Sequence, residues 1–174
     1  KPVKYAVTLT IVPAEETTKG AIDIDLSLGE PADTIWVNGN ELTVDAASLS
    51  VGGKKIAARA VPVRDEFIGF SLAEQAPAGP AKLHVEFQGK ISSKNDRGVF
   101  KEQEGDGTYV FSQFENIDAR RAFPCFDEPA YKVPWQVTLR VKEGDTALSN
   151  TPVLSESAPE GGMKTVRFAE TKPL

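Results

Sequence analysis

The stretch Ile22-Asp23-Ile24-Asp25-Leu26-Ser27-Leu28 alternates apolar and polar side chains without interruption. Successive side chains of a β-strand point to opposite faces, so this period of two predicts a strand with one buried face and one face in water. The same alternation recurs at residues 5–11, 83–87 and 135–141, whereas the 3.6-residue period of an amphipathic helix is nearly absent. The pattern therefore predicts a protein built from strands.

Turn-forming residues separate the candidate strands. Asn38-Gly39-Asn40, Gly52-Gly53 and Glu143-Gly144-Asp145 are combinations that favour tight turns. Roughly ten or more short strands with such turns indicate an all-β fold. We expect a saddle-shaped antiparallel β-sandwich of two or three sheets, with a short irregular or helical crossover near residues 116–131. No internal repeat or linker stands out, so we expect a single domain over residues 1–174.

The histidine and cysteine counts exclude several kinds of catalytic centre. A zinc hydrolase of the H-E-x-x-H type takes two histidines from one helix face, but the chain contains only His84. His84 falls on the polar face of its predicted strand, and we interpret it as an exposed residue without a catalytic role. The single cysteine, Cys125, excludes an internal disulfide, a zinc ribbon and a C-x-x-C redox pair. We expect it to be a small buried thiol.

Charge argues against two classes of partner. The chain has 20 Lys and Arg against 25 Asp and Glu, a net charge of −5. Affinity for nucleic acid or for an anionic membrane surface needs a basic face, and we expect neither. No apolar run approaches the roughly 20 residues that span a bilayer, so we expect no membrane insertion in this segment. The cellular location stays open.

The segment from Ser112 to Lys132 departs from the alternating pattern. It places charged residues among large aromatic side chains, in an order that does not repeat. A charge buried among aromatics costs several kcal/mol unless it is paired. We therefore expect arginine–carboxylate pairs that hold a structural crossover together. The candidate members of these pairs are Asp118, Arg120, Arg121, Asp127 and Glu128.

The same segment carries a resemblance to a known family. Ser112-Gln113-Phe114-Glu115 and Asp118-Ala119-Arg120-Arg121-Ala122-Phe123-Pro124-Cys125-Phe126-Asp127-Glu128-Pro129, followed by Lys132, closely resemble the amino-terminal domain of the gluzincin aminopeptidases, the aminopeptidase N-like zinc enzymes. The branch with puromycin-sensitive and endoplasmic-reticulum aminopeptidases is most similar. The resemblance extends over essentially the whole chain and implies a saddle of β-sheets that covers one wall of an active site.

Two departures from the family pattern limit what the resemblance implies. Arg97-Gly98-Val99-Phe100-Lys101 stands where many members carry a Gly-Phe-Tyr-Arg-Ser run. The Gly-x-Met-Glu-Asn exopeptidase loop and the H-E-x-x-H helix are absent, and in the family both lie in the next domain. The resemblance thus implies an excised amino-terminal domain: inactive by itself, with no cofactor of its own and with zinc in the parent enzyme.

The resemblance also implies a role for two residues and a backbone feature. The counterparts of Gln113 and Glu115 reach into the catalytic cleft and help bind the free α-amino group and first side chain of a peptide. The partners that the resemblance implies are the peptide N-terminus and the chain's own catalytic domain. It further implies a cis peptide bond between Glu115 and Asn116. From the residues alone, Gln113 and Glu115 would instead cap local backbone amides.

Two other functions remain open at the level of sequence. An autonomous β-sandwich module for protein interaction, without a peptidase partner, would carry the same strand pattern. A full-length relative with substituted zinc ligands would also carry it. Neither the preferred first residue of a substrate nor the oligomeric state follows from this chain.

Overall fold

A computed structural model describes residues 1–61 and 66–174, in which strands dominate and one short 3-10 helix is present. The strands are β1 (Pro2–Thr10), β2 (Thr17–Leu28), β3 (Ala32–Asn38), β4 (Thr43–Val51), β5 (Lys54–Val61), β6 (Phe67–Ala76), β7 (Gly79–Lys90), β8 (Gly98–Glu104), β9 (Gly107–Gln113), β10 (Trp135–Lys142), β11 (Val153–Glu156) and β12 (Met163–Phe168). The 3-10 helix, η1, spans Ala119–Arg121. The predicted all-β class is confirmed, and η1 lies in the predicted crossover.

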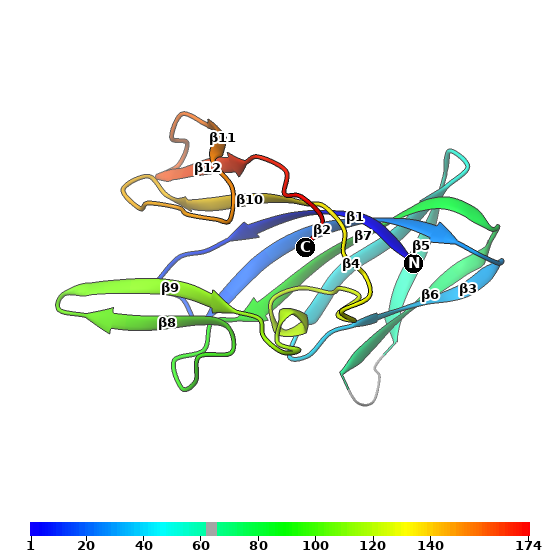
Figure 1. Ribbon diagram of the computed structural model, residues 1–174, viewed down its shortest axis with the longest axis horizontal. Coiled ribbons are helices and arrows are strands. Elements are labelled where there is room, and N and C mark those ends of the chain that lie inside the picture. Colours follow the sequence, from blue (N-terminus) through cyan, green and yellow to red (C-terminus); the bar gives the residue numbers. More distant parts are fainter. Residues whose placement is uncertain (62–65) are drawn as a thin grey trace.

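Ten strands form one sheet in the order β11-β12-β10-β1-β2-β7-β4-β5-β6-β3, and β8 and β9 form a separate hairpin. The large sheet curls from β10–β12 at one end to β3 and β6 at the other, and the hairpin projects to one side of it (Figure 1). Among the strand pairs of the described residues, β1 and β10 alone are parallel. The strands are therefore antiparallel as expected, except at this one parallel pair. Parallel neighbours need a long connection, and residues 11–134 provide it.

The alternation at residues 22–28 places the core. Ile22 and Ile24 on β2 have no exposed surface, and Ile22 lies opposite Val7 of β1 and Val85 of β7. Asp23 between them points to the other face, where its carboxylate lies 2.7 Å from Nδ1 of His84. Burying each large apolar side chain contributes about 1.5–3 kcal/mol, so this face holds the sheet together.

His84 is predicted to be an exposed residue without a catalytic role. In the structure its side chain is 37% exposed on the polar face and pairs with Asp23.

The crossover after β9 closes over the core. Asn38 at the end of β3 and Cys125 exchange backbone hydrogen bonds of 2.7 and 3.0 Å. The hydroxyl of Tyr5 accepts a hydrogen bond from the backbone N–H of Phe126 at 2.9 Å. The rings of Tyr5 and Trp135 stack with centroids 4.0 Å apart. Cys125 is 1% exposed, which confirms the expected buried thiol.

Candidate functional site

The end of β9 carries the two residues singled out in the sequence. Gln113 is the last residue of β9 and lies opposite Gly98, the first residue of β8. The side-chain oxygen of Gln113 accepts a hydrogen bond from the backbone N–H of Glu115 at 3.0 Å. The peptide bond between Glu115 and Asn116 is cis, as the resemblance implied. The Gln113 carboxamide therefore holds the backbone that presents Glu115.

Glu115 presents a carboxylate on the surface of the molecule. The residue is exposed, and within residues 1–61 and 66–174 its carboxylate has neither an ion pair nor a hydrogen bond. Large apolar side chains lie exposed on both sides of it along the chain: Tyr109 at 51%, Phe111 at 46% and Ile117 at 49%. Tyr109 and Phe111 share one face of β9 with Gln113, because alternate residues of a strand point the same way.

The crossover is anchored to β9 by short-range contacts. The backbone N–H of Asp118 donates to the carbonyl of Phe114 at 2.9 Å. The rings of Phe114 and Phe123 meet edge to face with centroids 5.5 Å apart. These contacts fold the chain back immediately after Glu115, so the backbone on both sides of this residue is fixed.

Arg120 binds two carboxylates inside the crossover. Its Nε lies 2.9 Å from Asp127, and its Nη1 lies 3.0 Å from Glu66. Burial by itself would lower the pKa of Arg120, but the hydrogen bonds to Asp127 and Glu66 outweigh it and raise this pKa above its ordinary value. The side-chain oxygen of Glu66 also accepts from Asn40 at 2.9 Å, so the network joins the crossover to two turns of the large sheet.

Arg121 forms a second network on the other side of η1. Its Nε lies 2.9 Å from Asp118 and its Nη1 lies 2.5 Å from Glu41. Glu41 in turn lies 2.6 Å from Nζ of Lys90, and its backbone has a φ of 57°. Lys90 and Arg121 together hold the pKa of Glu41 below its usual range, with the hydrogen bond from Lys90 the main cause.

Four of the five expected pairing residues thus meet carboxylates or arginines, namely Asp118, Arg120, Arg121 and Asp127. Glu128 is exposed and has no ion-pair partner in the part of the chain that the structure describes. Sequence reasoning missed Glu41 and Glu66, which lie 80 and 54 residues from their arginines. Nothing in the local pattern of either residue signals this role.

Two further features are absent from the described residues. Among the described residues, no group of three His, Cys, Asp or Glu side chains is placed to hold a metal ion. In the same ranges no helix has the length and apolar character needed to cross a membrane.

Comparison with known proteins places the whole chain in one family. The family model described as the Peptidase M1 N-terminal domain matches residues 1–174. The chain is 32% identical to "Aminopeptidase M1-D" of Oryza sativa subsp. japonica, over 98% of this chain and 20% of that protein. It is 33% identical to "Puromycin-sensitive aminopeptidase" of Caenorhabditis elegans, over 100% of this chain and 19% of that protein. A third relative, "Leucyl aminopeptidase" of Saccharolobus solfataricus, is 39% identical over 53% of this chain and 12% of that protein.

The chain therefore spans about one fifth of the length of the first two of these curated relatives. The match of the family model over every residue, together with these identities, shows that the chain belongs to the family of peptidase M1 N-terminal domains.

Proposed function

We propose that residues 1–174 form one domain that lines the cleft of a zinc aminopeptidase and binds the α-amino group of the peptide substrate through Glu115 and Gln113. One observation carries the proposal. The carboxylates of Asp118, Asp127, Glu41 and Glu66 around the crossover are all engaged by arginines. In the described ranges Glu115, like Glu128, has a carboxylate without a partner, but only Glu115 has its backbone N–H bound by the side chain of Gln113.

A free carboxylate at this place suits an ammonium group. An enzyme that removes the first residue of a peptide must hold the charged amine at a fixed distance from its reactive centre. A charge-assisted hydrogen bond to a carboxylate contributes about 1.5–3 kcal/mol. That corresponds to about 10- to 150-fold in affinity. Glu115 would thus discriminate between a free and a blocked amino terminus.

Gln113 would serve the same group in two ways. Its side-chain oxygen accepts the Glu115 N–H at 3.0 Å, which fixes the direction of the backbone at Glu115. An amide oxygen has two lone pairs, so the same atom can also accept a hydrogen bond from the substrate ammonium. The side chain of Gln113 can therefore cap the backbone N–H of Glu115 and contact the substrate at the same time.

The proposed partner of the domain is the catalytic part of the same polypeptide. The relatives are aminopeptidases about five times as long as the matched region. In our proposal the zinc ion of the complete enzyme lies in that further part. The single histidine of this chain cannot supply a typical zinc site. Tyr109, Phe111 and Ile117 expose apolar surface beside Gln113 and Glu115, which suits contact with another domain.

The test is Glu115→Ala in the complete protein that carries residues 1–174. The KM for an aminoacyl reporter with a free amine should rise about 10- to 150-fold, because one charge-assisted contact is lost. The zinc content should not change. A matched control is Glu104→Ala, which removes an exposed carboxylate at the far end of β8 and should leave KM unaltered.

Unchanged kinetics in Glu115→Ala would overturn the role of this residue. The rival function is an autonomous interaction module with no peptidase partner. A complete protein that lacks both an exopeptidase loop and an H-E-x-x-H helix would favour that rival.

A further inference from the structure

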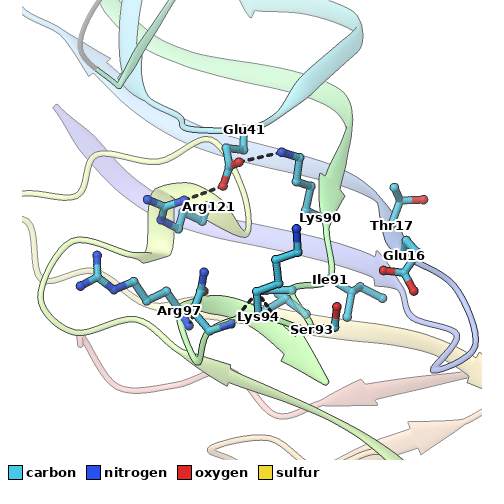
Figure 2. Close-up of a pocket in the computed structure, with 12 residues that line it drawn as sticks. Glu16, Thr17, Glu41, Lys90, Ile91, Ser93, Lys94, Arg97 and Arg121 are labelled. Atoms are coloured by element: carbon cyan, nitrogen blue, oxygen red, sulfur yellow. Dashed lines mark hydrogen bonds and ion pairs between the residues drawn. The ribbon is translucent and has the colours of Figure 1, made fainter. Parts of the chain in front are cut away.

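A pocket of about 430 Å³ lies between η1 and the loop that joins β7 to β8. Figure 2 shows Glu41 at one side of this pocket, with Lys90 and Arg121 reaching it from different elements. Lys94 extends toward them from the loop below, and Arg97, on the same loop, lines the pocket with its side chain directed to one side. The floor includes Ile91 and Val99, which are 2% and 4% exposed. The wall of the pocket is thus strongly charged.

The charges in the wall do not balance. Four cationic side chains face two carboxylates, Glu16 and Glu41, although the chain as a whole has a net charge of −5. Glu16 is already bound by Nζ of Lys101, which is not part of the wall. Glu41 is shared by Lys90 and Arg121 at 2.6 and 2.5 Å. Within residues 1–61 and 66–174, the side chains of Lys94 and Arg97 have no acidic partner.

The loop that carries the two unshared cations has a defined backbone. The hydroxyl of Ser92 accepts the backbone N–H groups of Lys94 and Asn95, both at 3.2 Å. The side-chain oxygen of Asn95 accepts the N–H of Arg97 at 3.3 Å. On the opposite wall, Asp118 fixes the guanidinium of Arg121 at 2.9 Å. These bonds define the backbone that carries Lys94 and Arg97 and the position of the Arg121 guanidinium.

Glu41 behaves as an internal anion in this site. Its backbone adopts a φ of 57°, a region that residues other than Gly, Asn and Asp seldom occupy, and its carboxylate binds both Lys90 and Arg121. Half of the cationic wall thus already binds a carboxylate from the chain itself. The other half, Lys94 and Arg97, offers the same chemistry to a ligand.

We propose that this pocket is an anion-binding site that takes the phosphate group of a small phosphorylated molecule, held by Lys94, Arg97 and Arg121. Guanidinium and ammonium groups that converge from different elements are the usual partners of phosphate oxygens. A volume of about 430 Å³ exceeds what inorganic phosphate alone needs, so the pocket has room for an organic body beside the phosphate. The site is separate from the proposed role of Glu115 and does not depend on it.

The experiment is isothermal titration calorimetry on the complete protein with inorganic phosphate and, separately, with glycerol 3-phosphate at constant ionic strength. The double variant Lys94→Ala/Arg97→Ala should weaken binding of both probes by about tenfold or more, because two charge-assisted contacts are lost. Both side chains are exposed and neither bonds to the described part of the protein, so the variant should fold. Glu41→Gln should tighten binding, since it removes the competing carboxylate.

The control is Lys55→Ala/Arg140→Ala, which removes two exposed charges of the same kind outside the pocket. It should keep the affinity of the wild type within about twofold, since remote surface charges are screened. An equal loss of affinity in this control would show that overall charge, and not the pocket, determines binding, and would overturn the proposal. Absence of binding in the wild type, or weaker binding in Glu41→Gln, would also overturn it. Tighter binding of glycerol 3-phosphate than of phosphate identifies an esterified ligand. Equal binding of the two would overturn the assignment of an organic ligand and leave phosphate itself.

Discussion

Arg120 donates from Nε to the carboxylate of Asp127 across 2.9 Å, and both side chains are almost buried, at 12% and 13% exposed. The pair spans seven residues and closes the crossover into a compact unit directly after Glu115. The second contact of Arg120, to Glu66, attaches this unit to the start of β6. One guanidinium thus fixes the crossover internally and against the sheet.

Replacing Arg120 by Ala should lower the free energy of unfolding by about 3–5 kcal/mol, because it leaves the buried carboxylate of Asp127 without a counter-charge. Urea unfolding of residues 1–174 followed by tryptophan fluorescence measures this change. Arg59→Ala, which removes an exposed arginine of β5, should change the free energy of unfolding by less than about 0.5 kcal/mol. Equal stability of Arg120→Ala and the wild type would contradict the structural role of the pair.

Gly98→Ala should destabilise the junction between the hairpin and η1. Gly98 has a φ of 66°, and an added Cβ would lie 2.7 Å from Cβ of Arg121. Backbone strain and overpacking each cost about 1–3 kcal/mol, so we expect a loss of about 2 kcal/mol or more in urea unfolding. The matched control is Gly144→Ala, where no atom lies within 4 Å of the new Cβ. A stability loss of the same size in both variants would show that the close contact with Arg121 is unimportant.

Cys125 should be chemically inert in the folded protein. Burial raises the pKa of its thiol, so the reactive thiolate is scarce even at about pH 8. A thiol reagent such as 5,5′-dithiobis(2-nitrobenzoate) should release almost no chromophore from the folded chain and one equivalent after unfolding in guanidinium chloride. Rapid labelling of the folded chain would show that the crossover opens easily around Cys125.

The ion pairs of Glu41 should make stability depend on pH in the acid range. Lys90 and Arg121 lower the pKa of Glu41 below its ordinary value of 4.5. A carboxyl group with a lowered pKa in the folded state stabilises the fold above its unfolded pKa, and this contribution is lost as the pH falls through the folded pKa. Glu41→Gln should therefore be less stable than the wild type at pH 7, and the difference should shrink as the pH falls below 4.5.

The side chain of Glu41 is 41% exposed, so the effect should be small and should weaken further in high salt. Parallel pH profiles for the two proteins throughout the acid range would contradict this prediction.

Local residue patterns were enough to predict the strands and the faces they bury. The alternation at residues 22–28 is local, and the burial of Ile22 and Ile24 follows from it directly. The aromatic and charged run at 112–132 marked the crossover, which contains η1. The resemblance to the aminopeptidase family was also recognised from this run, and the family model that matches residues 1–174 confirms it.

Which distant residues meet depends on how the packed strands and turns are arranged in three dimensions. The parallel alignment of β1 and β10 depends on how a long connection runs, and no local pattern specifies that path. Glu41 and Glu66 stand 80 and 54 residues from Arg121 and Arg120. The sequence around a single surface glutamate does not indicate which distant residue it pairs with. The cationic pocket combines side chains from the β7–β8 loop, a turn after β3 and η1. Alternation reports which face of a strand is buried, whereas charge pairing across the molecule is set only when the packed sheet fixes the positions of its turns.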